Sequence, residues 1–174
     1  EPLVMGIYNY NEKQRRAREI RDSRIGENDA YWFFNTVDDV NNKWGMLKAT
    51  RPDNIKIMLL NAERYDSLKN VNNRLGIKGV SPAVLDHVVQ RAKKDSLRIF
   101  VHAETAFDVK IALISGAHVL AHHPGHAWNG NPNELAKYEI SDDLIELAKQ
   151  NKVTNIATTS IAKKYAINYL DGTP

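Results

Sequence analysis

Short apolar runs alternate with amphipathic segments along most of the chain, and this alternation constrains the fold more than any other feature. The apolar runs have the length of β-strands, and the intervening segments repeat apolar residues at helical spacing. Strands and helices that alternate in this way are joined by crossover connections, which make the strands parallel. The sequence therefore predicts an α/β fold with a parallel sheet covered by helices. The clearest strand segments are residues 54–60, 98–103, 118–122 and 153–158.

Capping residues mark the helix boundaries. Thr36 is followed three positions later by Asp39, the spacing of a capping box, and predicts a helix that runs to about Lys48. Gly116 is expected to end another helix, because glycine readily adopts the left-handed conformation found at helix C-termini. Hydroxyl side chains and a proline supply the other starts. Three further helices are expected to begin at Ser81-Pro82, Thr105 and Ser141. A last helix is expected over residues 160–170.

The composition predicts a single domain over residues 1–174. A chain of 174 residues that is 43% hydrophobic can bury one sizeable core and is short for two. Residues 1–30 give a weaker structural signal: residues 2–8 are expected to form a strand, and the polar residues 9–28 show no clear periodicity. The first residue is Glu1 rather than methionine, so we expect the natural chain to begin upstream.

The charge pattern argues against nucleic-acid and membrane partners. The formal net charge of +3 arises from 24 basic and 21 acidic residues, and the basic excess is concentrated in residues 13–21. No aromatic residue interleaves with this run, so we interpret it as a solvated segment. No apolar stretch approaches the roughly 20 residues of a membrane span, and the compartment stays undefined. Cysteine is absent, so any zinc site must use nitrogen and oxygen ligands.

Two strand segments end at histidines, at the edge where parallel α/β folds carry their chemistry. His102 and His122 close these segments. Because side chains alternate between faces, Lys56 and His102 are expected opposite the aliphatic faces of their strands, and Leu120 on the same face as His122. Polar groups pointing inward near a barrel mouth would produce this pattern. The two motifs are Val101-His102-Ala103-Glu104-Thr105 and Leu120-Ala121-His122-His123-Pro124-Gly125.

The segment from Pro52 to Gly125 resembles the amidohydrolase superfamily, most closely its imidazolonepropionase-like and dipeptidase-like branch. The resemblance implies a distorted (β/α)8 TIM-type barrel that holds one or two divalent metal ions, usually zinc, at its C-terminal mouth. It also implies hydrolysis of amide or related bonds in a small-molecule or dipeptide-like substrate. The residues that carry the resemblance are the two histidine motifs, together with Asp53-Asn54-Ile55-Lys56-Ile57-Met58 and Ser115-Gly116-Ala117-His118-Val119.

The same resemblance implies roles for three residues. His102 corresponds to the metal ligand of barrel strand 5, and His122 to that of strand 6. Lys56 falls where some members carry a carboxylated lysine that bridges two metals. The chemistry agrees, because neutral imidazoles are good zinc ligands, whereas Lys56 can serve only after conversion to an anionic carbamate. A bound metal would lower the pKa of its water to about 7 and polarise the scissile carbonyl.

Structural roles stay open for the same residues. His102 and His122 each have the alternative of a hydrogen-bonded core histidine, and Lys56 that of a lysine paired with a carboxylate. Glu104 and His123 are candidates for substrate contact, with an exposed strand end and a surface loop as their alternatives. The remaining histidines are interpreted as structural or surface groups, namely His87, His118 and His126.

The chain also departs from the amidohydrolase pattern. It has no His-x-His pair for the first barrel strand and no counterpart of the general-base aspartate of the last strand. A whole barrel needs about 250 residues. We therefore interpret the chain as an interior piece, roughly barrel strands 3 to 7, that needs the remainder of the barrel from the same longer chain. Alone it is expected to be inactive, and a homo-oligomer is left open.

Two alternatives to the hydrolase belong to other classes of function. One is a non-catalytic α/β binding domain on a barrel scaffold, which metal-free histidines and a carboxylate paired with Lys56 would favour. The other is a doubly wound nucleotide-binding domain. The absence of a glycine-rich phosphate loop after any strand argues against the second class.

Overall fold

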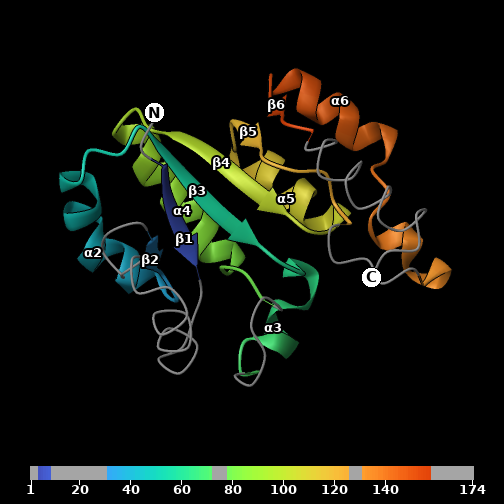
Figure 1. Ribbon diagram of the computed structural model, residues 1–174, viewed down its shortest axis with the longest axis horizontal. Coiled ribbons are helices and arrows are strands. Elements are labelled where there is room, and N and C mark those ends of the chain that lie inside the picture. The colour runs from blue at the N-terminus through green and yellow to red at the C-terminus, as the bar shows by residue number, and fades with distance from the viewer. Residues whose placement is uncertain (1–3, 9–30, 72–77, 126–130, 158–174) are drawn as a thin grey trace, which may run out of the picture.

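A parallel sheet forms the centre of the molecule, in a computed structural model that describes residues 4–8, 31–71, 78–125 and 131–157. Its strand order is β2-β1-β3-β4-β5-β6, and each neighbouring pair is parallel (Figure 1). From β3 to β6 the order in space follows the order in sequence, as expected for a section of a barrel. The strands are β1 (Val4–Tyr8), β2 (Tyr31–Phe33), β3 (Asn54–Leu59), β4 (Arg98–Ala103), β5 (Val119–Leu120) and β6 (Thr154–Asn155).

Helices follow the strands and cover one face of the sheet. In Figure 1, α4 and α5 lie behind β3 and β4, and α6 lies beside β6. The main helices are α2 (Val37–Ala49), α4 (Pro82–Lys94), α5 (Ala106–Ser115) and α6 (Asp142–Gln150). Shorter helical turns occupy the connections, namely η1 (Ala62–Arg64), α3 (Tyr65–Leu68) and η2 (Pro132–Lys137). No helix of the described ranges is long and apolar enough to cross a bilayer.

The predicted caps at Thr36, Ser81, Thr105 and Gly116 are confirmed, whereas Ser141 precedes α6 as expected but its side chain makes no capping hydrogen bond. The Thr36 hydroxyl accepts from the backbone N–H of Asp39, whose carboxylate accepts from the Thr36 backbone in return. The Ser81 hydroxyl accepts from the Val84 N–H at the start of α4. Gly116 ends α5 with φ 94°, in the left-handed region. These local contacts explain why the helix boundaries can be read from the sequence.

Several expected elements differ in extent. Strands β5 and β6 have two residues each, shorter than the expected segments 118–122 and 153–158. The connection after β3 contains two short helical segments, η1 and α3. Strand β2 is an element that the sequence analysis does not predict. Strand β1 lies between β2 and β3 and pairs with both of them. The helix expected over residues 160–170 lies outside the described residues.

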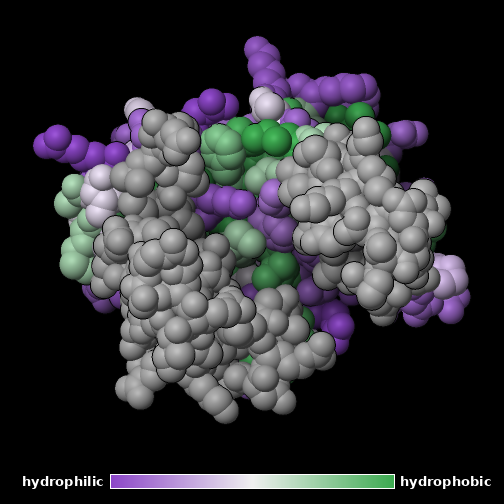
Figure 2. Space-filling view, in the orientation of Figure 1, coloured by the Kyte–Doolittle hydropathy of each residue, from purple (hydrophilic) through white to green (hydrophobic). Residues whose placement is uncertain are grey.

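The two faces of the central strands differ as predicted for β3 and β4. Ile55, Ile57 and Leu59 are fully buried against the helices, and so are Ile99, Val101 and Ala103. The opposite face carries Lys56 and Met58, which are half-buried. In Figure 2, hydrophilic and hydrophobic side chains are intermixed on the side of the molecule that faces the viewer. One face of the sheet is therefore an aliphatic core, and the other is chemically mixed.

The face predicted for the strand segment 118–122, which contains β5, is wrong. The register pairs Val119 with Phe100 and Leu120 with Val101. Leu120 therefore shares the helix-covered face of Val101, and Val119 shares the face of Phe100 and His102. The sequence predicts the reverse, with Val119 toward the helices and Leu120 on the opposite face. The error arises because alternation within one strand does not specify which face meets the helices.

His118 gives a pH-dependent contribution to stability. Its Nδ1 accepts a hydrogen bond of 3.1 Å from the Ile99 backbone N–H, which requires the neutral ring. Burial, followed by the charges of Arg98 and Lys93, holds the pKa of His118 below its usual 6.5. The contribution is therefore complete above that value and is lost as the pH falls below it. Urea unfolding at about pH 7.5 and about pH 5 should show this loss, and His118→Asn should reduce the pH dependence. An unchanged pH dependence in the variant would contradict the assignment.

Candidate functional site

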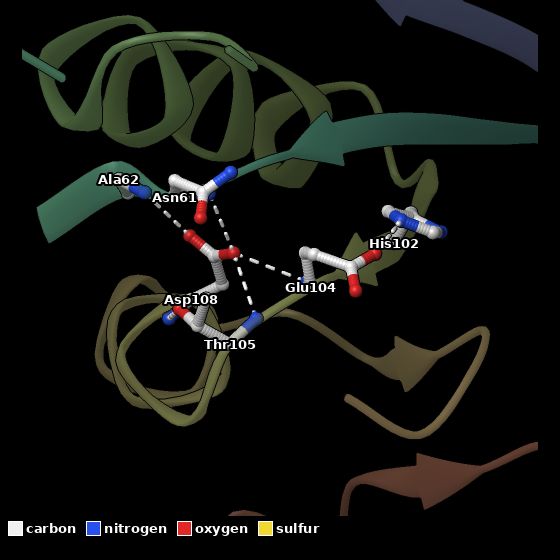
Figure 3. Close-up of polar contacts among 6 residues, drawn as sticks. All are labelled: Asn61, Ala62, His102, Glu104, Thr105 and Asp108. Carbon is white, nitrogen blue, oxygen red and sulfur yellow. Dashed lines mark hydrogen bonds and ion pairs between the residues drawn. The ribbon is translucent and has the colours of Figure 1, made fainter. Parts of the chain in front are cut away.

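The carboxyl ends of β4 and β5 bring two histidines and a glutamate together. His102, the fifth residue of β4, is buried, with its Nε2 3.4 Å from Oε2 of Glu104. The ring of His122, just past β5, meets the His102 ring edge-on, with the centroids 5.1 Å apart and the planes at 70°. Glu104 is only 3% exposed, so the alternative of an exposed strand end does not apply to it. The side chains of His102 and Glu104 point toward each other in Figure 3.

Asp108 is the residue of this region that sequence reasoning missed. Its side chain lies in the first turn of α5 and is fully buried. Oδ2 accepts from the backbone N–H groups of Asn61, Glu104 and Thr105, at 3.0–3.1 Å, and Oδ1 accepts from that of Ala62 at 2.8 Å (Figure 3). The spacing of Thr105 and Asp108 is that of a capping box, which was a sequence signal for the local part of this role.

The surroundings of Asp108 act on its charge in opposite directions. Burial raises the pKa of Asp108, and the backbone hydrogen bonds from Ala62, Thr105 and Glu104 oppose that rise. Both carboxylate oxygens are occupied by backbone donors. Asp108 is therefore a structural carboxylate that joins the loop after β3 to the start of α5.

Further polar contacts extend the hydrogen-bond network around Asp108 along the carboxyl ends of the strands. The Thr105 hydroxyl donates to Glu63 at 3.1 Å, and Lys137 Nζ donates to the Asn61 side chain at 3.3 Å. The Gly125 N–H donates to the Glu104 carbonyl at 3.0 Å, which fixes one end of the loop that carries His122. The loops after β3, β4 and β5 are thus held together by hydrogen bonds at the edge that carries the histidines.

Lys56 lies on the same face as His102 but farther from the strand end. The register pairs Lys56 with Phe100 and pairs Met58 with His102. Burial lowers the pKa of Lys56, which favours the neutral amine. Among the described residues, no hydrogen bond or ion pair joins Lys56 to either histidine or to a carboxylate. Its carboxylation stays a prediction.

The other histidines occupy different surroundings. His123 is exposed, and its ring lies 3.4 Å from the Asn155 side-chain nitrogen. His87 contacts the Asn41 side chain at 2.8 Å on the surface of α4, as expected for a structural group. His126 lies outside the described residues.

The residues at the strand ends supply donor types that suit zinc, namely two imidazoles and a carboxylate. Within the ranges that the structure describes, no group of three or more histidine, aspartate or glutamate side chains is arranged to hold a metal ion. His102 and His122 fit the expected metal in their chemistry, and the full set of ligands is not assembled among the described residues.

Comparison with known proteins finds likeness at the level of structure. No family model matches the sequence, and no curated protein does. The chain is similar to a crystal structure of an amidohydrolase (TM-score 0.53, 18% identity, 74% of this chain and 27% of that one). It is also similar to a Xaa-Pro dipeptidase with bound methionine (0.50, 18%, 71% and 26%) and to A. niger ochratoxinase (0.57, 16%, 80% and 28%).

The chain thus spans between 26% and 28% of the length of these three structures. At identities of 16–18% the likeness establishes the fold alone. Together with the parallel order of β3 to β6, it shows that the chain has the α/β fold of a portion of a TIM-type barrel.

Proposed function

We propose that this chain forms part of a metal-dependent hydrolase that cleaves amide or related C–N bonds through a metal-activated water. The observation that carries the proposal is the meeting of the His102 and His122 rings at the carboxyl ends of two neighbouring parallel strands. Catalytic groups of such barrels come from this end of the strands. The structural neighbours named as an amidohydrolase, a dipeptidase and an ochratoxinase support the hydrolase class.

In this proposal His102 and His122 hold a divalent ion, and Lys56 as a carbamate is a candidate third ligand. The bound ion would supply a Lewis acid and a water acidic enough to act as a nucleophile near neutral pH. Glu104 contributes a buried negative charge beside the His102 ring, which orients that ring and favours binding of a cation. His123, exposed at the same edge, is a candidate for substrate contact.

A general base is also required. Asp108 does not fill this role, because its two oxygens accept four backbone N–H groups. The aspartate that the resemblance implies has no counterpart next to His102 among the described residues. The proposal therefore assigns metal binding to this chain and leaves the proton-transferring aspartate to another part of the barrel.

Metal binding should depend on both histidines. In the protein that carries this sequence, His102→Asn and His122→Asn are each expected to weaken Zn²⁺ affinity at least tenfold, because each removes one imidazole ligand. Affinity is measured by calorimetric titration with ZnCl₂, alongside metal-dependent hydrolysis of a dipeptide panel. His87→Asn, on the surface of α4, is the matched control. Wild-type Zn²⁺ affinity in both site variants would overturn the proposal.

The second candidate, a non-catalytic α/β binding domain, is favoured by one observation. No ready-made group of three ligands exists among the described residues. A second observation counts against this alternative. It expects a carboxylate partner for Lys56, and the contacts among the described residues include none. Small-molecule binding that is unchanged by removal of Zn²⁺ with a chelator would favour the binding domain over the hydrolase.

A further inference from the structure

A short segment of the connection after β5 reaches the loop after β3. Residues 131–138, which we call the strap, comprise Asn131, η2 and Tyr138. Lys137 donates from Nζ to the side-chain oxygen of Asn61 at 3.3 Å, across 76 positions of sequence. In Figure 1, η2 is the orange helical turn on the side toward which β3 and β4 point. Because β4 lies between β3 and β5, this link passes the carboxyl end of β4.

Tyr138 holds the strap on the β5 side. A Cβ atom added to Gly125 would lie 3.7 Å from the Tyr138 ring, so the two residues are in close contact. The Gly125 N–H donates in turn to the Glu104 carbonyl at 3.0 Å. Burial, and after it the charges of nearby glutamates that include Glu104, raises the pKa of Tyr138. The strap therefore contacts the loops on both sides of the loop that carries Glu104.

The strand end that the strap passes carries buried groups of the candidate site. His102 and Glu104 are both buried, although they lie at the carboxyl end of β4. Helices cover the opposite face of the sheet, so an ion that binds His102 must come from the strand ends. Groups buried to this extent are reached only when the residues over them move apart.

The strap buries little of its own surface. No residue of η2 is buried, and Leu135 is 52% exposed. A cavity of about 430 Å³ lies between the strap and the loop after β5. Segments with few buried apolar contacts open at a low cost in free energy, so a single hydrogen bond can shift the opening equilibrium of the strap. The cavity is lined by Pro124, Gly125, Leu135, Tyr138 and Glu139.

We propose that the strap is a gate over His102 and Glu104, held shut by the hydrogen bond from Lys137 to Asn61. Breaking this bond lets the strap move away and exposes the His102 ring. The gate itself rests on the contacts of the strap, and the identity of what enters, a divalent ion, rests on the proposed hydrolase function. Release of the gate should raise the rates at which Zn²⁺ enters and leaves the site.

Chemical modification of His102 tests the gate without metal or catalysis. Diethyl pyrocarbonate reacts with imidazoles that it can reach, and peptide mass spectrometry gives the rate at each histidine. Lys137→Met keeps the aliphatic stem and removes the donor. It is expected to speed modification of His102 about three- to tenfold, because one lost hydrogen bond shifts the opening equilibrium by that factor.

Two controls accompany this measurement. His87, on the surface of α4, should be modified at an unchanged rate. Lys149→Met removes an exposed lysine that is paired with Glu146 on α6, and it should leave the rate at His102 unchanged. Thermal unfolding checks that each variant is folded. An unchanged rate at His102 in folded Lys137→Met would overturn the proposal.

The acceptor side provides a second test. Asn61→Gly removes the acceptor and suits the left-handed φ of 53° at this position. It should speed modification of His102 as Lys137→Met does, and the double variant should add little, because both changes remove the same bond. Effects that add in the double variant would refute the latch.

A cross-link tests the closed state. The chain has no cysteine, so Asn61→Cys combined with Lys137→Cys introduces two unique thiols that a short bismaleimide can join. Modification of His102 should be slower in the linked protein than in the same variant without the linker. Equal rates in the linked and unlinked proteins would contradict the gate.

Zn²⁺ exchange, followed by stopped-flow mixing with a fluorescent chelator, separates the gate from the proposed function. Faster modification of His102 in Lys137→Met, without any binding of Zn²⁺, would count against the hydrolase and in favour of the gate. Zn²⁺ that binds but exchanges at one rate in wild type, Lys137→Met and the linked protein would count against the gate and in favour of the metal site.

Discussion

Replacing Asp108 by alanine is expected to lower the free energy of unfolding by about 3 kcal/mol or more. The substitution leaves four backbone N–H groups without their acceptor, and those of Ala62, Glu104 and Thr105 belong to buried residues. Removal of a buried charge offsets part of this loss, because burial raises the pKa of Asp108. Asp108→Asn removes the charge and keeps one acceptor, so its loss should be smaller. Urea unfolding near neutral pH measures both.

The capping box of α2 offers a matched control. Asp39 occupies the equivalent position, accepts from the Asn35 and Thr36 N–H groups and lies at an exposed helix end. Asp39→Ala is expected to cost about 1 kcal/mol, the usual contribution of a helix cap. The additional loss in the free energy of unfolding of Asp108→Ala measures the contribution of the buried hydrogen bonds from Asp108 to the loop after β3. Equal losses for the two alanine variants would show that those bonds add nothing.

Gly79→Ala is the second substitution with a large expected effect, a loss of about 2–4 kcal/mol in the free energy of unfolding. A Cβ atom at this position would lie 2.2 Å from the Met58 carbonyl oxygen and 2.6 Å from the Leu60 nitrogen. Both are backbone atoms of β3 and its continuation, so no side-chain rotation relieves the clash. The segment must move away, which also breaks the 3.1 Å hydrogen bond from the Val80 N–H to the Met58 carbonyl.

Gly45→Ala is the control for this prediction. Gly45 lies within α2, and a Cβ atom added there meets nothing within 4 Å. Alanine loses less conformational entropy than glycine on entering a helix, so this variant should be about 0.5–1 kcal/mol more stable. Thermal and urea unfolding of the two variants should therefore shift in opposite directions. A wild-type stability for Gly79→Ala would mean that the loop moves away from β3 at little cost.

Local signals account for the parts of the fold that the sequence predicts well. The caps at Thr36, Ser81 and Thr105 involve neighbours within three or four residues. They can therefore be predicted from the local sequence. The alternating aliphatic residues Ile55, Ile57 and Leu59 likewise predict which face of the strand is buried.

Contacts between distant segments were harder to predict. The bond from the Ala62 N–H to Asp108 spans 46 residues, and nothing near Asp108 in the sequence indicates this partner. The face of Leu120 depends on the register between β4 and β5, which alternation alone does not supply. The prediction that His102 and His122 lie together at a sheet edge succeeded, because strand ends of a parallel sheet gather at one side.

The sharing of one carboxylate between two loops has a consequence for protein engineering. Because Asp108 binds Asn61 and Ala62 as well as Glu104 and Thr105, the loop after β3 and the start of α5 behave as a single exchangeable module. A graft that replaces only one of them breaks the shared contacts, whereas transplanting both with Asp108 preserves them. Libraries that vary the mouth of this barrel section should therefore recombine these two segments as a unit.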